Sequence, residues 1–169
     1  MKKIFKYIFA GMAAMSVVAC SEDALETSPS SSVSGNELLG TATNALVSLN
    51  GVYRAMYTAG VSNSSNTHQC FGITAYNLVA DVMGEDCIMN GQGSGWFWYD
   101  CVYNVKSRYT STGWRSYDMW NGYYTWISNA NYILGAKETM EGEEADINYI
   151  MGQAHAIRAY SYFMLAQSF

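Results

Sequence analysis

The chain has 169 residues and a formal charge of −5; half of its residues are apolar, 15% are aromatic and only 14% are charged. This length and composition fit one folded domain with a sizeable core. An acidic balance without a basic run excludes nucleic-acid binding, and no apolar run reaches the roughly 20 residues of a membrane span, which excludes a polytopic membrane protein.

The first 19 residues have the features of an export signal. Three lysines stand among the first six residues, and residues 7–19 form an apolar stretch that is too short for a comfortable membrane span. The stretch ends in Val17-Val18-Ala19-Cys20, which resembles a bacterial lipobox, where the cysteine is lipidated and the bond before it is cut. We therefore expect a lipoprotein signal peptide at residues 1–19 and lipidation at Cys20. The alternative is an ordinary signal peptide with a cysteine near its cleavage site.

Residues 20–35 are expected to form a tether. The segment is polar and contains Pro29, the only proline of the chain. Such a composition is typical of a flexible linker that holds a globular domain away from a lipid surface. The folded domain is therefore expected to cover residues 36–169.

Apolar residues at steps of three and four predict four helices in this domain. The first is expected over residues 36–59 and the second over residues 73–83, ending at a glycine. The third is expected over residues 114–140, and the fourth follows an acidic turn with Asp146 as its cap. The last two should form a helical hairpin, so the predicted fold class is mostly α. The face that the third helix is expected to bury comprises Trp114, Tyr117, Trp120, Tyr123 or Tyr124, Ile127, Ala130, and Ile133 or Leu134.

Residues 85–113 have no helical period. The segment is expected to form either a hairpin around its glycines or a long irregular loop. Loops of this length without structure of their own are uncommon unless they have a function. It contains the cluster Trp96-Phe97-Trp98-Tyr99.

Candidates for catalysis and metal binding are weak. The two histidines, His68 in a polar loop and His155 in the last predicted helix, are more simply structural. Asp81, Glu85 and Asp86 could be the paired carboxylates of a glycosidase, although solvated acids at a helix end are the simpler interpretation. We therefore expect no catalytic residue, no metal site and no cofactor, so the protein is not expected to be an enzyme.

Three cysteines follow Cys20 in the sequence, namely Cys70, Cys87 and Cys101. An exported compartment permits disulfides, but an odd number cannot pair fully within one chain. No CxxC motif is present, and a zinc site would need a tighter set of ligands. We expect buried thiols that act as small apolar side chains, while the disulfide state stays open.

Three segments are distinctive beside the lipobox and the tether. They are Ala45-Leu46-Val47-Ser48-Leu49-Asn50-Gly51-Val52-Tyr53, Asn129-Ala130-Asn131-Tyr132-Ile133-Leu134 and Gly152-Gln153-Ala154-His155-Ala156-Ile157-Arg158-Ala159-Tyr160-Ser161-Tyr162-Phe163. Over essentially the whole chain, these features resemble the N-terminal part of the SusD/RagB family, the surface nutrient-binding lipoproteins of Bacteroidetes. Members of that family are far longer, so residues 36–169 are expected to be a truncated, incomplete α-helical domain.

The resemblance implies tetratricopeptide-like helical hairpins with long ligand-binding loops. It also implies a lipoprotein of the outer membrane that faces the cell exterior, captures oligosaccharides without catalysis and delivers them to a TonB-dependent, SusC-like transporter. The segment Ala159-x-x-x-Phe163 matches one fragment of the tetratricopeptide pattern, although no strict repeat period is visible. The alternative is a helical-repeat lipoprotein that acts as a protein-interaction or assembly module.

The ring cluster is the strongest candidate for the ligand site. Sugars present C–H faces that lie flat on indole and phenol rings, while polar side chains bind their hydroxyls. The polar residues near the rings are Asp86, Asn90, Gln92 and Asp100. We therefore expect Trp96, Trp98, Asp86 and Asn90 to bind glycan. The alternative is that the rings fill the core or an interface.

Overall fold

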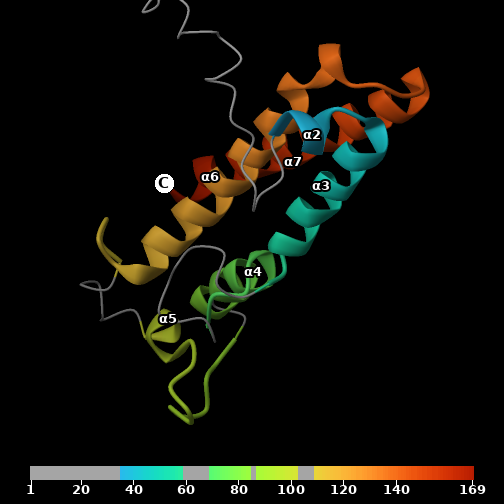
Figure 1. The fold of residues 1–169 in the computed structure, drawn as a ribbon. Coiled ribbons are helices and arrows are strands. Elements are labelled where there is room, and N and C mark those ends of the chain that lie inside the picture. Colours follow the sequence, from blue (N-terminus) through green and yellow to red (C-terminus); the bar gives the residue numbers. More distant parts are fainter. Residues whose placement is uncertain (1–34, 59–68, 85–86, 103–108) are drawn as a thin grey trace, which may run out of the picture. The chain divides into compact units, whose positions relative to one another are not determined.

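The computed structural model describes residues 35–58, 69–84, 87–102 and 109–169, and it has no strand in these ranges. The elements are α2 (Gly35–Leu39), α3 (Ala42–Ala55), α4 (Ile73–Met83), α5 (Trp98–Cys101), α6 (Trp114–Gly135), the 3-10 helix η4 (Lys137–Thr139) and α7 (Glu144–Ser168). All of them belong to one unit, Gly35–Phe169 (Figure 1). The predicted mostly α fold class is confirmed.

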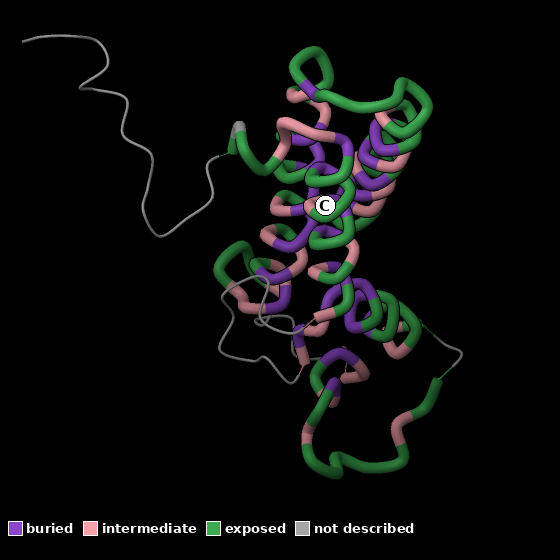
Figure 2. The backbone as a smooth tube through the Cα atoms, turned by 45° about the vertical axis from the view of Figure 1, so that its right-hand side comes forward, coloured by how far each residue is buried: buried purple, intermediate pink, exposed green. Residues whose placement is uncertain are grey.

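α6 and α7 form the expected antiparallel hairpin. The rings of Trp120 and Phe169 meet near one end, with centroids 5.3 Å apart. Further along, the Arg158 guanidinium donates to Asn131 Oδ1 at 3.0 Å. α3 packs on both helices, and its Tyr53 hydroxyl donates to Gln153 Oε1 of α7 at 3.0 Å. Buried residues form stripes along these three helices (Figure 2), and the largest fully buried side chains include Trp126, Tyr123, Leu49, Ile133 and Ile150.

The first predicted helix is divided into α2 and α3. The Ala42 N–H donates to Glu141 O at 2.8 Å, and the Glu141 N–H donates to Gly40 O at 2.9 Å. Because these backbone groups are bonded to the segment before α7, they cannot continue a helical ladder. Thr41 then caps α3, with its Oγ1 accepting from the Asn44 N–H at 3.2 Å. The prediction of one continuous helix from residue 36 was therefore wrong at this point.

α4 begins after a close approach of the backbone to the end of α3. The Ile73 N–H donates to Met56 O at 2.8 Å. Gly72 has a φ of +72°, and a Cβ at this position would overlap the Met56 carbonyl. Only glycine fits such a turn without displacing the neighbouring chain. From here Tyr76 reaches the core, where its ring packs on Tyr123 and Trp126.

The N-terminal half of α6 buries a different face from the one predicted. Tyr117 and Trp120 are exposed, whereas Arg115 and Asp118 are buried. Both buried polar residues lie against groups of other elements: Arg115 binds Asp100 of α5, and the Asp118 carbonyl accepts a hydrogen bond from Tyr76 of α4 at 2.9 Å. Apolar periodicity alone gave the wrong face here, and for Arg115 the reason is the carboxylate that α5 supplies.

Candidate functional site

The ring loop, residues 87–101, leads from the end of α4 into the short helix α5. Of the two structures expected here, a hairpin or an irregular loop, the hairpin is wrong, because the described residues contain no strand. The segment is an irregular loop that ends in α5. A turn near its tip is closed by the Gly95 N–H, which donates to Gln92 O at 2.8 Å. Gly93 and Gly95 both have positive φ values, which glycine adopts without steric cost.

Phe97 anchors the ring loop to the body of the domain. It has a φ of +56°, the only positive value at a non-glycine position among the described residues. Such a conformation costs about 1–3 kcal/mol and persists only where the surroundings enforce it. Here the Phe97 N–H donates to Gln69 Oε1 at 3.0 Å, and its buried ring packs edge-on against Phe71 with centroids 6.1 Å apart. The Arg115 guanidinium lies 5.1 Å from the centre of the same ring.

A buried ion pair joins α5 to α6. Asp100 and Arg115 are 5% and 3% exposed. Arg115 Nη2 lies 2.7 Å from Asp100 Oδ2, and its Nε donates to Oδ1 at 3.2 Å. The third guanidinium nitrogen, Nη1, donates to Gln69 O at 3.0 Å, and the Trp114 ring covers the guanidinium at 4.1 Å. This bidentate contact between the guanidinium and the carboxylate fixes both the distance and the orientation of α5 relative to α6.

Tyr109 completes this cluster. Its hydroxyl donates to Asp100 Oδ1 at 2.5 Å. Burial, followed by the hydrogen bond to Asp100, raises the pKa of the Tyr109 hydroxyl well above its usual value of 10.0. The hydroxyl therefore remains a donor throughout the physiological pH range. A cavity of about 180 Å³, the ion-pair pocket, opens beside the cluster and is lined by Gln69, Gly95, Tyr99, Asp100, Tyr109, Trp114 and Arg115.

The predicted glycan-binding residues lie on or near this loop. Trp96 is 49% exposed, Asn90 is also exposed, and Trp98 is half-buried as the first residue of α5. Asp86 lies outside the described residues. Asp100 was counted among the polar residues available to sugar hydroxyls, but it is buried and bound to Arg115. Its role in the fold is to hold the loop, so the exposed rings and Asn90 remain the groups that face solvent.

The sequence did not single out Arg115, Tyr109 or Gln69. Arg115 and Gln69 are 46 positions apart in the chain, and Arg115 and Asp100 are 15 apart. No local pattern brings such residues together. Arg115 is not a member of the apolar face predicted for the third helix, so the apolar pattern gave no signal for it.

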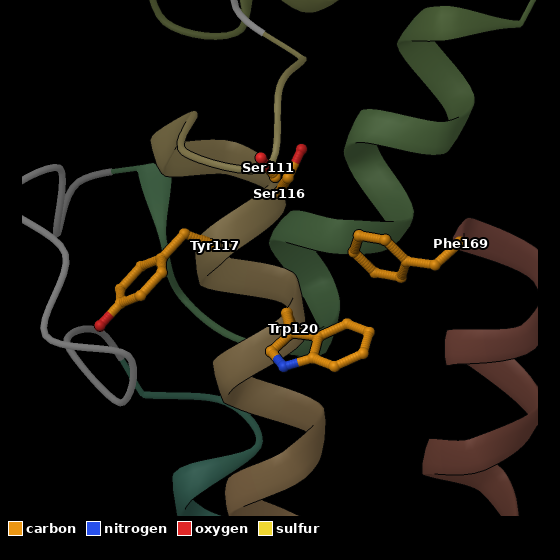
Figure 3. A pocket seen from close by; sticks show the side chains of 5 residues that line it. All are labelled: Ser111, Ser116, Tyr117, Trp120 and Phe169. Atoms are coloured by element: carbon orange, nitrogen blue, oxygen red, sulfur yellow. The ribbon is translucent and has the colours of Figure 1, made fainter.

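A second hollow lies beside α6. It has a volume of about 320 Å³ and is lined by Ser111, Ser116, Tyr117, Trp120 and Phe169 (Figure 3). The rings near it form the aromatic surface, which we define as Tyr117, Trp120, Tyr124, Tyr162 and Phe169, all exposed. Trp120 is the centre of this surface, with its ring centroid 4.6 Å from Tyr124 and 5.3 Å from Phe169.

Asp118 is a buried carboxylate on α6. It is 0% exposed, and neither of its oxygens has a nitrogen or oxygen donor among the described residues. Burial raises the pKa of the Asp118 carboxyl, while a hydrogen bond from Cys70 and the charge of Arg115 act in the opposite direction. The net shift is upward, as expected for a carboxylate removed from water.

The three described cysteines differ in how far they are exposed to solvent. Cys70 is buried, as expected, but Cys87 is exposed and Cys101 is half-buried. The expectation of a buried thiol was therefore wrong for Cys87, because the ring loop carries it into solvent.

The described residues contain no group of three or more His, Cys, Asp or Glu side chains that could hold a metal ion. His155 lies on the surface of α7 with its Nδ1 3.2 Å from Arg158 Nη2, while His68 lies outside the described ranges. Of the three acids considered for a glycosidase, Asp81 is exposed and the other two are not described. Within the same ranges no helix combines the length and hydropathy needed to cross a bilayer.

Comparison with protein families gives one match. A family model described as "Starch-binding associating with outer membrane" matches residues 84–169, which include the ring loop, α6 and α7. No curated protein and no solved structure matches the chain.

Proposed function

The chain belongs to the SusD-like family, whose description is starch binding in association with the outer membrane, and from this premise we propose that it is a surface-exposed lipoprotein that captures oligosaccharides. In this proposal Cys20 carries the lipid anchor, the binding surface faces the cell exterior, and the glycan passes to a TonB-dependent, SusC-like transporter. The family description names binding and no reaction, which supports capture without catalysis.

The ring loop is the described feature that best supports glycan capture. Trp96 and Tyr99 expose aromatic rings on which the C–H face of a sugar can lie, and the amide of Asn90 can donate to and accept from sugar hydroxyls. The ion-pair pocket, at about 180 Å³, is smaller than the roughly 300–1,000 Å³ of typical ligand pockets. The exposed rings of the loop would therefore supply most of the contact area.

The anchoring of the loop also favours binding. Phe97 and the Asp100–Arg115 pair hold the loop end in one position before any ligand arrives. A surface that is already ordered loses less conformational entropy on association, and this raises affinity without new contacts.

The second candidate function is a protein-interaction module. The aromatic surface on α6 and α7 favours it, because Trp120, Tyr124 and Phe169 form a continuous set of exposed rings. Tyrosine and tryptophan are enriched where proteins bind one another. In this case the bound partner would cover Trp120, and changes in the ring loop would not affect binding.

Affinity electrophoresis in gels containing soluble starch or other polysaccharides tests the first proposal. We expect Trp96→Ala and Trp98→Ala to reduce retardation of the protein in the gel. Tyr149→Ala is the control, because it removes an exposed ring from α7, far from the loop in sequence. A parallel thermal melt separates loss of binding from loss of structure, since truncating a core tryptophan costs about 3–5 kcal/mol.

The outcomes distinguish the two functions. If the parent is retarded and both tryptophan variants are retarded equally, the ring loop is not the glycan site. If the parent is not retarded by any polysaccharide of the panel, glycan capture is contradicted. Loss of a protein partner on Trp120→Ala, with no effect of Trp96→Ala, would favour the interaction module.

A further inference from the structure

Three asparagines of the chain are followed directly by glycine, and the fold places them in different surroundings. Asn50-Gly51 lies inside α3 and Asn121-Gly122 lies inside α6, whereas Asn90-Gly91 lies in the ring loop. In an Asn-Gly pair the glycine nitrogen can attack the asparagine side chain with little hindrance, because glycine has no Cβ. The three pairs therefore offer the same chemistry in different structural settings.

The two helical pairs are protected by their backbone. Beyond the first turn of a helix, each N–H donates to the carbonyl four positions earlier, so the nitrogens of Gly51 and Gly122 are already bound. Gly122 is in addition buried. An attack by either nitrogen would require the helix to open locally, and such opening costs free energy.

The pair in the ring loop has no such protection. Asn90 and Gly91 are both exposed (Figure 2) and lie outside every helix of the described ranges. The Gly91 N–H donates to no backbone carbonyl among the described residues. A Cβ at Gly91 would meet no atom within 4 Å, so the Asn90 side chain can turn toward the glycine nitrogen without displacing a neighbour.

We propose that Asn90 is a site of spontaneous deamidation, at which the folded chain converts its own asparagine to aspartate and isoaspartate. The Gly91 backbone nitrogen forms a bond with Asn90 Cγ, and the bond from Cγ to Nδ2 breaks. Ammonia leaves with the proton of the Gly91 N–H, and a succinimide ring remains. Water then adds to either carbonyl of the ring and opens it. The conversion consumes one water molecule for each ammonia released and involves no oxidation or reduction.

The products differ from asparagine in ways that bear on the proposed glycan site. An amide donates and accepts hydrogen bonds, whereas an ionised carboxylate only accepts, so a sugar hydroxyl that accepts from Asn90 would lose its donor. Isoaspartate also inserts a methylene into the backbone, just before the turn that the Gly95 N–H closes on Gln92 O. This consequence rests on the proposed function, whereas the deamidation itself does not.

Peptide mapping by mass tests the proposal on the full chain. The folded protein is incubated in mildly alkaline buffer, where hydroxide promotes loss of the backbone proton, and samples are digested at mildly acidic pH. We expect the peptide with Asn90 to gain the mass difference between a hydroxyl and an amino group and to separate into two isomers. The peptides with Asn50 and Asn121 should keep their mass. In urea-denatured protein all three should be converted, because no helix then protects the other two.

Gly91→Ala is the matched variant. Its methyl group hinders attack on the preceding side chain, yet it meets no atom of the fold, and the φ of Gly91 is not positive. The converted peptide should therefore be lost while the thermal melt stays unchanged. Equal conversion of all three asparagines in the folded protein would overturn the proposal. So would an Asn90 peptide that keeps its mass until urea is added, or an unchanged rate in Gly91→Ala. The readout involves no polysaccharide, so failure of deamidation and failure of glycan capture are recognised independently.

Discussion

Removing Arg115 is the most direct perturbation of the candidate site. The guanidinium makes two contacts with the Asp100 carboxylate, donates to Gln69 O and lies between the rings of Trp114 and Phe97. In Arg115→Met the apolar volume is largely kept, but Asp100 stays buried without its counter-charge. Leaving one partner of a buried ion pair uncompensated costs about 3–5 kcal/mol.

The size of this effect follows from burial. Both side chains are at least nine-tenths buried, so bulk water cannot fully replace the lost partner. The Tyr109 hydroxyl still donates to Asp100, which places the expected loss for Arg115→Met near 3 kcal/mol, the lower end of that range. The double variant Asp100→Asn/Arg115→Met removes both charges and should lose less stability than the sum of the two single variants, with a coupling of about 0.5–3 kcal/mol.

Urea denaturation followed by circular dichroism measures the free energy of unfolding for the parent, both single variants and the double variant. Arg158→Met is the matched control, because Arg158 pairs with Asn131 on the surface of the same hairpin and its loss should change stability by no more than about 0.5 kcal/mol. A cost below about 1 kcal/mol for Arg115→Met, or strict additivity in the double variant, would refute the argument that this pair is buried and coupled.

Three further predictions concern other positions. Gly122→Ala should lower the free energy of unfolding by about 1–3 kcal/mol, because the new Cβ would overlap the Tyr76 hydroxyl. Gly51→Ala, in open space on α3, should instead raise the free energy of unfolding by about 0.5–1 kcal/mol. Equal effects of the two changes in urea denaturation would contradict the predicted overlap at Gly122. The raised pKa of Asp118 means that the folded state binds more protons than the unfolded state above the ordinary value of 3.8, so this residue makes stability fall as pH rises from there toward the folded-state pKa. Asp118→Asn should therefore flatten stability across that window, measured by urea denaturation at several pH values; an unchanged pH profile would argue against a buried carboxylate. Cys20→Ala should release the protein from membranes and abolish labelling by a fatty-acid probe, and a variant that stays membrane-bound with unchanged label would exclude the lipobox interpretation.

Much of the helical framework could be predicted from the sequence. The bounds of α4 agree with the expected 73–83, and α7 follows the acidic turn as expected, although its N-cap is Glu143 and the expectation of Asp146 as the cap was wrong. These features are local, because the spacing of apolar residues along a helix fixes which side chains share one face. The exposure of Trp96 and Asn90 was also consistent with the glycine-rich, polar composition of their segment.

Other features depended on contacts between distant segments. The break between α2 and α3 is set by backbone bonds to Glu141, and the burial of Arg115 is set by Asp100 on α5. The left-handed conformation of Phe97 likewise depends on Gln69 and Phe71. Burying a polar group or holding a strained backbone conformation costs free energy, which contacts with specific partners offset. Those partners are distant in the sequence, so only the tertiary structure identifies them.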